Sequence, residues 1–371
     1  MTDAPKRVLL VYSRVGGGHL SAARALAAEL ESSGKATTRL VDAYVECGRF
    51  PATLIPAAYA RLARGHPKLW SMVYHRSTTL NPQWVLGPFL KSGFEREIAD
   101  FGPDVVVSVL PAINGLLASA ANYTGARLEV VLTDWHSVHR FWVASGVSHY
   151  AASTESARQD CVRYGAPPDL IDVVGIPVRR EFAGGIDRQA ARARLVGSGL
   201  DAKTFTILAM VGAEGSPKAL ANVARLAQLD LDAQMLVICG RNEALRRHVA
   251  QLPARMQVRA LGFVDNVAEL MCAADLLLTK AGGVTLAEAF CSGVPVVVHD
   301  VLPGQEAGNL EHVLAQQAVW FAPDPEALAR IAREMVRDPG QRAALAERGA
   351  RLARPLASQE IVRGLLERAG V

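Results

Sequence analysis

Two glycine-rich turns and the polar residues around them are the parts of this sequence best suited to chemistry. In the C-terminal half, an apolar strand over Asp275–Thr279 leads into Lys280-Ala281-Gly282-Gly283, and a helix is predicted to start at Val284–Thr285. Small residues and backbone N–H groups at a helix N-terminus favour anions by about 0.3–1 kcal/mol each. Glu288 lies in the first turns of this helix. The next predicted strand, Pro295–His299, precedes a loop with three polar side chains, Gln305, Glu306 and Asn309.

The residues 279–309 together predict a ligand crevice. An ordinary strand, turn and helix would explain Gly282-Gly283 alone. Polar side chains beyond the carboxyl ends of two parallel strands, however, meet at one edge of the sheet, where ligands of such sheets bind.

A second glycine-rich turn follows the first predicted strand, Arg7–Tyr12. Gly16-Gly17-Gly18 lets the backbone approach a ligand closely, and His19 stands at the start of a helix predicted to end near Ser33. A histidine with the ordinary pKa of about 6.5 suits the role of a general base. The alternative is that His19 only contacts phosphate or backbone at the helix N-terminus.

A third polar segment, Thr133-Asp134-Trp135-His136, ends another predicted strand, and His139 and Trp142 follow it. Its position at the carboxyl end of a strand places it at the crevice. Asp134, His136 and His139 suggest a metal site, but no further cluster of ligands is visible. We therefore expect no metal and assign these residues to a base, an orienting pair or a substrate contact.

Two series of alternating strands and helices must position these residues. The first runs from Arg7 to about Val174, and the second restarts at the predicted strand Thr204–Val211. The pattern predicts an α/β protein with two Rossmann-like domains facing a central cleft. We expect an N-terminal domain over residues 1–178, a C-terminal domain over 179–354 and a final helix over 355–371 that packs back on the N-terminal domain.

Residues 44–100 depart from this rhythm, since aromatic and cationic residues alternate there and five prolines are predicted to cut the segment into short helices. Aromatic and cationic side chains together suit the headgroup zone of a membrane, which favours a lipid-facing cap. The alternative is that the aromatics form the core of a helical insertion. The prolines are Pro51, Pro56, Pro67, Pro82 and Pro88.

Composition narrows the class of protein. The chain has 371 residues, 50% of them hydrophobic, and a net charge of +4, which fits a globular protein that binds an anionic ligand or an anionic membrane surface rather than nucleic acid. Five cysteines without CxxC spacing indicate reduced residues in a cytoplasmic protein. No run reaches the roughly 18 apolar residues of a membrane span, so we expect peripheral contact with the inner face of the cell membrane.

Six motifs together resemble glycosyltransferase family 28, in particular monogalactosyldiacylglycerol synthases and processive diacylglycerol glucosyltransferases. The resemblance spans nearly the whole chain and extends, more distantly, to the N-acetylglucosaminyltransferase of peptidoglycan synthesis. The motifs are GGGH (Gly16–His19), TDWHSVHRFW (Thr133–Trp142), GIPV (Gly175–Val178), GFVDN (Gly262–Asn266), TKAGGVTLAEAF (Thr279–Phe290) and PGQEAGN (Pro303–Asn309).

The resemblance implies a GT-B fold, a UDP-sugar donor, no cofactor and a role for each matching residue. The main chain near Phe263 would hold the uracil, and Glu288 the ribose hydroxyls. His19 would be the base, with Asp134 near it as the second candidate. The diphosphate would be held by Gly215, Ser216, Ala281, Gly282, Gly283 and Thr285, and the sugar by Gln305 and Glu306. Asn309 would also bind the donor, and the acceptor side would include Gly17, Gly18, His139 and Trp142.

The function expected is transfer of a hexose, galactose or glucose, from a UDP-sugar to diacylglycerol, with inversion to a β-glycolipid. One departure from the family pattern is Ala213, which stands where the branch has glycine. The acceptor region 44–100 shares only scattered positions with the family. Alternatives are transfer of N-acetylglucosamine to a polyprenyl-linked or other lipid, a UDP-sugar 2-epimerase, an inactive nucleotide-binding scaffold and a nicotinamide-linked oxidoreductase.

Overall fold

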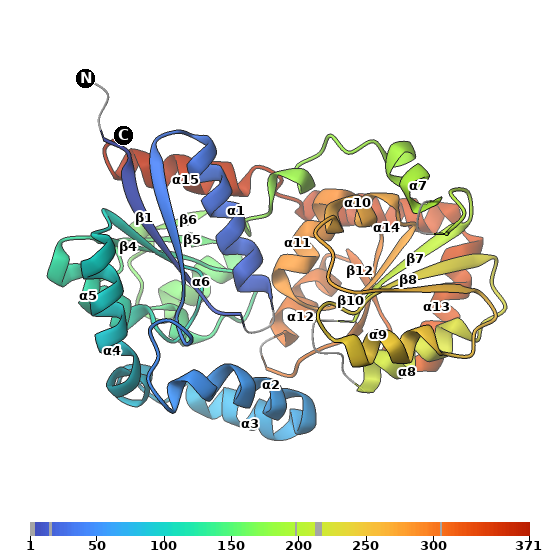
Figure 1. Cartoon of the computed structure of the whole chain (residues 1–371), viewed down its shortest axis with the longest axis horizontal. Helices are drawn as coiled ribbons and strands as arrows, with labels where there is room; N and C mark the ends of the chain where they lie inside the picture. The colour runs from blue at the N-terminus through green and yellow to red at the C-terminus, as the bar shows by residue number, and fades with distance from the viewer. Residues whose placement is uncertain (1–3, 15–16, 197–198, 212–216, 305) are drawn as a thin grey trace. The chain divides into compact units, whose positions relative to one another are not determined.

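Each half of the chain folds around a parallel β-sheet of its own (Figure 1). The computed structural model describes residues 4–14, 17–196, 199–211, 217–304 and 306–371. It divides into two units, one formed by Met1–Arg180, Pro303–Asn309 and Arg354–Val371 and the other by Glu181–Leu302 and Leu310–Ala353. We call these the N-terminal unit and the C-terminal unit.

The sheet of the N-terminal unit has the strand order β2-β1-β3-β4-β5-β6, and all neighbouring strands run parallel. Runs such as Val8–Val11 and Val105–Val107 are fully buried, as expected of strands covered on both faces. The strands are β1 (Lys6–Tyr12), β2 (Ala36–Asp42), β3 (Val105–Ser108), β4 (Arg127–Val131), β5 (His149–Ala152) and β6 (Ile171–Val173).

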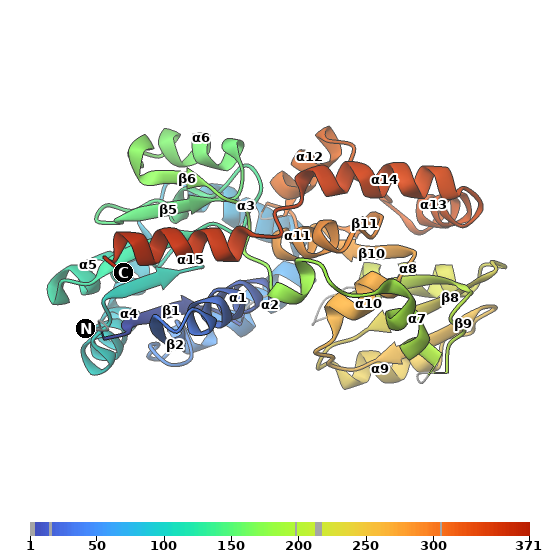
Figure 2. The same ribbon diagram turned by 90° about the horizontal axis from the view of Figure 1, so that it is seen from above.

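Helices cover this sheet, and the last helix of the chain is one of them. α15 packs against α1 (Figures 1 and 2), and Arg368 donates two hydrogen bonds, of 3.0 and 2.7 Å, to the buried carboxylate of Glu129 on β4. The helices are α1 (Gly18–Ser32), η1 (Ala52–Leu54), α2 (Ile55–Gly65), α3 (Pro67–Ser77), α4 (Pro82–Phe101), α5 (Asn114–Thr124), η2 (Arg140–Trp142), α6 (Glu155–Arg163), η3 (Pro168–Leu170) and α15 (Ala357–Arg368).

The helical insertion between β2 and β3 corrects one prediction. Pro56, Pro67 and Pro82 each lie in the first turn of a helix, where a missing N–H costs nothing. Pro88, in contrast, lies inside the 20-residue helix α4, so the prediction that it breaks the segment is wrong. Packing outweighs the lost hydrogen bond, because Leu90, Phe94 and Ile98 of α4 are buried in the core of the unit.

The sheet of the C-terminal unit has the order β12-β11-β10-β7-β8-β9, again with parallel neighbours. The strands are β7 (Phe205–Met210), β8 (Ala233–Ile238), β9 (Gln257–Leu261), β10 (Leu276–Lys280), β11 (Val296–Asp300) and β12 (Val319–Phe321). The helices are α7 (Arg188–Val196), α8 (Pro217–Ala227), α9 (Glu243–Ala250), α10 (Val267–Ala273), α11 (Gly283–Ser292), α13 (Pro325–Arg337) and α14 (Pro339–Leu352). Two further helices, η4 (Arg180–Phe182) and α12 (Ala307–Ala315), have residues in both units.

The strand orders explain why the glycine-rich turns matter. In the N-terminal unit the order reverses between β1 and β3, and in the C-terminal unit between β7 and β10. Ligands of open parallel sheets bind beyond the carboxyl ends of the strands at such a reversal. The turn before His19 follows β1, and the turn at Gly282-Gly283 follows β10, so each sheet places one predicted motif at its ligand-binding edge.

Candidate functional site

His19 lies in the first turn of α1, directly after Gly17 and Gly18. Gly17 has a φ of 78°, a conformation that favours glycine, and contributes no side-chain cap to the helix. Within the described part of the chain, no group pairs with the buried Nδ1 of His19. Burial lowers the pKa of His19 to about 4. The ring is therefore neutral near pH 7 and has a nitrogen able to accept a proton.

Asp134 follows β4 and is held from two sides. Trp142, which is fully buried, donates from Nε1 to Asp134 Oδ2 at 2.9 Å, and the side chain of Asn309 also bonds to the carboxylate. Burial raises the pKa of Asp134 to about 6, with a further rise from the nearby charge of Glu306, while the two hydrogen bonds lower it. Asp134 is thus a carboxylate of unusually high basicity at the edge of the sheet.

His139 connects this segment to the helical insertion. Its Nδ1 accepts from the N–H of Phe141 at 3.2 Å, which places the proton on Nε2, near Ser77 Oγ (3.1 Å) and Tyr74 O (3.3 Å). The ring of Tyr74 also packs edge-on against His139, with centroids 4.8 Å apart. Because its nitrogens are engaged by α3 and by its own turn, His139 fixes the end of α3 beside Asp134.

The first turn of α12 and the residues before it pack against the same segment. Asn309 Oδ1 accepts from the N–H of Trp135 at 2.7 Å, and both residues are buried. Glycines allow the close approach: a Cβ on Gly304 would lie 2.7 Å from the ring of Tyr74, and a Cβ on Gly308 only 2.3 Å from the carbonyl oxygen of His136. The structure therefore brings together Asp134, predicted as a catalytic residue, and Glu306 and Asn309, predicted as donor-side.

In the C-terminal unit, the helix start that was predicted to hold a diphosphate is α11. Its cap residue, Gly282, is extended (φ −71°, ψ 128°) and has no side chain to bond the first-turn N–H groups. Gly283 and Thr285 lie in that first turn. The N–H of Ala281 donates to the carbonyl of Asp300 on β11 at 3.3 Å. The helix start itself, rather than Ala281, is thus the part suited to an anion.

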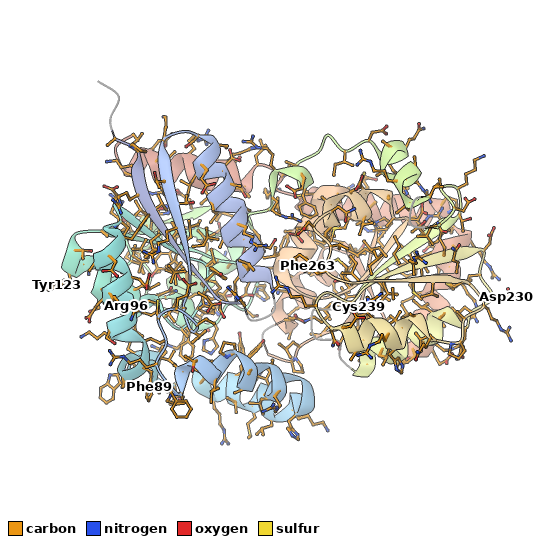
Figure 3. The ribbon with its side chains drawn as sticks, viewed as in Figure 1. Phe89, Arg96, Tyr123, Asp230, Cys239 and Phe263 are labelled. Atoms are coloured by element: carbon orange, nitrogen blue, oxygen red, sulfur yellow. The ribbon has the colours of Figure 1, made fainter. Side chains whose placement is uncertain are left out.

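Glu288 and Phe263 occupy different positions in the same unit. Glu288 lies on α11 and is 6% exposed, so its carboxylate is accessible only to a ligand that lies directly against this helix. Phe263, after β9, is 55% exposed, and the guanidinium of Arg241, after β8, lies 5.0 Å from the centre of its ring (Figure 3). A flat cation and an exposed ring at two adjacent strand ends suit the stacking of a planar base.

Three predicted donor residues, Gly215, Ser216 and Gln305, lie outside the described residues. Among the residues that the structure does describe, no group of three or more His, Cys, Asp or Glu side chains could hold a metal ion. In the same residues no helix combines the length and apolar character needed to cross a membrane.

Comparison with known proteins places the sequence in a family. The monogalactosyldiacylglycerol (MGDG) synthase family model matches residues 19–178, and the model of glycosyl transferases group 1 matches residues 198–352. The chain is 30% identical to the probable monogalactosyldiacylglycerol synthase 2, chloroplastic, of Oryza sativa subsp. indica, over 98% of this chain and 81% of the relative.

The chain belongs to the monogalactosyldiacylglycerol synthase family.

A second relative is named for transfer of a different sugar, and a solved structure shares the fold. The chain is 28% identical to a processive diacylglycerol beta-glucosyltransferase of Bacillus pumilus, over 82% of this chain and 80% of the relative. The crystal structure of MurG of Acinetobacter baumannii superposes with a TM-score of 0.63 at 16% identity, over 98% of this chain and 100% of that one. The predicted family and the predicted GT-B fold are confirmed.

Several residues of this family member were missed by the sequence analysis. Asn114 Nδ2 donates to the carbonyl of Trp142 at 2.9 Å, and Ser108 donates to Asn114 Oδ1 at 2.6 Å, so both position the partner of Asp134. In the C-terminal unit, Nδ2 of Asn222 on α8 lies 3.0 Å from Nδ1 of His299, which is buried near the end of β11. Ser108 and Asn114 belong to none of the six motifs, and nothing in the sequence links positions 222 and 299.

Proposed function

We propose that this protein is an inverting glycosyltransferase that moves a hexose, galactose or glucose, from a UDP-sugar to the 3-hydroxyl of diacylglycerol. The observation that carries the proposal is the 30% identity over 98% of the chain to a monogalactosyldiacylglycerol synthase. A second relative, at 28% identity, is named for glucosyl transfer to diacylglycerol. The two names share the lipid and differ in the hexose, so they support one acceptor class and two donor sugars.

The transfer needs a base for the acceptor hydroxyl. In the proposed step the base takes the hydroxyl proton, the oxygen bonds to the anomeric carbon from the face opposite UDP, and the bond from that carbon to the diphosphate breaks with inversion. Asp134, with a pKa raised to about 6, is better matched to catalysis near pH 7 than His19, with a pKa lowered to about 4. His19 also stays a candidate, because its ring is neutral near pH 7 and its buried Nδ1 has no partner among the described residues.

The departing UDP carries negative charge, and the start of α11 in the C-terminal unit is suited to stabilise it. Gly282 does not cap this helix with a side chain. A helix N-terminus carries about half a positive elementary charge, which stabilises an anion most strongly where water is excluded. The donor diphosphate is proposed to bind at α11 of the C-terminal unit. Glu288 and the ring of Phe263 are proposed to contact the ribose and the base.

The helical insertion supports a membrane surface as the partner that presents the lipid. Between Glu46 and Glu95 the sequence has six Lys or Arg residues and no Asp or Glu. Anionic lipid attracts each such cation by about 1 kcal/mol near the surface. The same segment exposes apolar side chains that are rarely left in water: Phe50 (76%), Leu54, Leu69, Met72, Val73, Leu80, Trp84 (83%) and Val85. Tyr59, Trp70 and Tyr74 instead pack on one another and support α2 and α3 from within.

Sedimentation with vesicles tests the membrane surface. The wild type is expected to bind vesicles that contain anionic phosphatidylglycerol more tightly than vesicles of phosphatidylcholine alone. The double variant Phe50→Ala/Trp84→Ala should lose most of this binding. Tyr123→Ala is the control, because Tyr123 is 90% exposed on α5, outside the insertion (Figure 3). Equal binding by all three proteins would contradict a role for this surface.

UDP release in mixed micelles tests the reaction. UDP-galactose, UDP-glucose and UDP-N-acetylglucosamine are each supplied with and without diacylglycerol. Release that depends on diacylglycerol and prefers one hexose supports the proposal and settles the donor. Release from UDP-N-acetylglucosamine that ignores diacylglycerol would favour an epimerase or another acceptor.

A further inference from the structure

The polar groups of Asn309 are engaged by the protein itself. Its side chain is 1% exposed, and its Oδ1 accepts from the N–H of Trp135 at 2.7 Å, across 174 positions of sequence. This bond fixes the orientation of the carboxamide, with the oxygen toward Trp135. The NH2 group can therefore donate to the carboxylate of Asp134, which accepts a side-chain hydrogen bond from Asn309. A buried carboxamide with both ends engaged has little surface left for a sugar.

The position of Asn309 makes it a link between two functional segments. It lies in the first turn of α12, and Glu306, directly before that helix, is also buried and close enough to Asp134 for their charges to repel. Its two partners lie in the segment after β4, which carries the proposed base. Trp142 holds the other side of the same carboxylate. Without Asn309, among the residues that the structure describes, only the hydrogen bond from Trp142 would hold the carboxylate of Asp134 against the repulsion from Glu306.

We propose that Asn309 is a positioning residue that ties the first turn of α12 to the Asp134 carboxylate and keeps that carboxylate aimed at the acceptor, rather than a residue that contacts the donor sugar. The proposal rests on the proposed function for its kinetic consequences only. Its structural core, the bond between the Asn309 carboxamide and Asp134, is testable without activity.

Asn309→Asp is the sharpest variant. Its carboxylate keeps an acceptor for the N–H of Trp135 but replaces the NH2 donor with a like charge beside Asp134. The acid limb of kcat/KM is expected to move to higher pH by at least one pH unit, so that kcat/KM falls about twofold at pH 7 and at least tenfold well below pH 6, and recovers toward pH 9. Asn309→Ala removes both bonds without adding a charge and should move the limb in the same direction by less. Glu311→Gln, an exposed change on the same helix, is the matched control.

An NMR titration supplies the readout that does not need turnover. The indole N–H of Trp142 donates to Asp134, so its resonance should report the ionisation of that carboxylate. Trp142→Phe identifies the resonance by its loss among the five tryptophans. The midpoint of its titration should rise in both Asn309 variants and stay unchanged in Glu311→Gln. Thermal melts of all variants confirm that they are folded, and Asn309→Ala serves if the Asp variant is not.

The outcomes separate the two claims. If KM for the UDP-sugar rises while the acid limb and the indole midpoint stay in place, Asn309 is a sugar contact and the proposal is overturned. If the wild type transfers no hexose to diacylglycerol, the proposed function fails, but the indole titration still decides the role of Asn309. A raised midpoint together with a displaced acid limb establishes it.

Discussion

Gly308→Ala should disable the enzyme by moving one backbone segment away from another. Gly308 is buried in the first turn of α12, and an added Cβ would lie 2.3 Å from the carbonyl oxygen of His136 and 2.7 Å from Ser137 Cβ. Ordinary contact begins at 3.4 Å, so the two segments must separate by about 1 Å. A backbone carbonyl cannot rotate aside as a flexible side chain can.

The expected cost follows from what the two segments carry. One holds Asp134 and the other Glu306 and Asn309, and a displacement of about 1 Å between catalytic groups can cost about 100-fold in rate. We therefore expect kcat to fall about 100-fold. Overpacking also costs typically 1–3 kcal/mol of stability, which lowers the melting temperature without unfolding the protein at 25 °C.

The assay is steady-state transfer to diacylglycerol, beside a thermal melt of each variant. Ala307→Ser is the control, because Ala307 is exposed in the same turn of the helix. A Gly308→Ala enzyme with wild-type kcat would refute the reasoning, since it would mean that the contact with His136 is not needed in the reacting state.

Three further predictions test single groups. Trp142→Phe removes a hydrogen bond to a charged group, worth about 1.5–3 kcal/mol, so the pKa of Asp134 should rise by about one to two pH units. The acid limb of kcat/KM should rise by the same amount, and an unmoved limb in a folded variant would exclude Asp134 as the base. His19→Gln should lower kcat by about 10²–10⁴-fold if His19 is the base, and single-turnover rates that match the wild type would exclude that role. Burial lowers the pKa of His299 to about 4, so between pH 6.5 and 4 the unfolded state binds a proton that the folded state does not. The free energy of unfolding should therefore fall by about 3 kcal/mol as the pH drops through this range. His299→Leu should lack this loss when urea denaturation is compared at pH 7.5 and 4.5, and an equal loss in both proteins would contradict the prediction.

Most of the strand and helix order followed from the sequence. The strand predicted at Arg7–Tyr12 matches β1, and the strand predicted at Thr204–Val211 matches β7, because buried parallel strands are continuous apolar runs between turn residues. Among the described residues, α5, α9 and α12 were not predicted as helices, and the start of α12 was taken for part of the loop after the predicted strand Pro295–His299.

The partners within the site were less predictable than the elements. The motifs placed Asp134 and Asn309 at strand ends, but Trp135 and Asn309 bond across 174 residues, and only the folded chain brings them together. The pKa values of Asp134 and His19 depend on burial, which a motif does not report. The course of α4 through Pro88 depends on packing against the core, a tertiary effect that outweighs local propensity.

The most direct test of the central claim is the structure of the lipid product. The purified protein is incubated with diacylglycerol micelles and the hexose donor that releases most UDP, and the extracted lipid is examined by proton NMR. The account predicts a single hexose on the 3-hydroxyl of glycerol, with the large anomeric coupling of a β-linkage. An α-linked product, or a released sugar with no glycolipid, would contradict it.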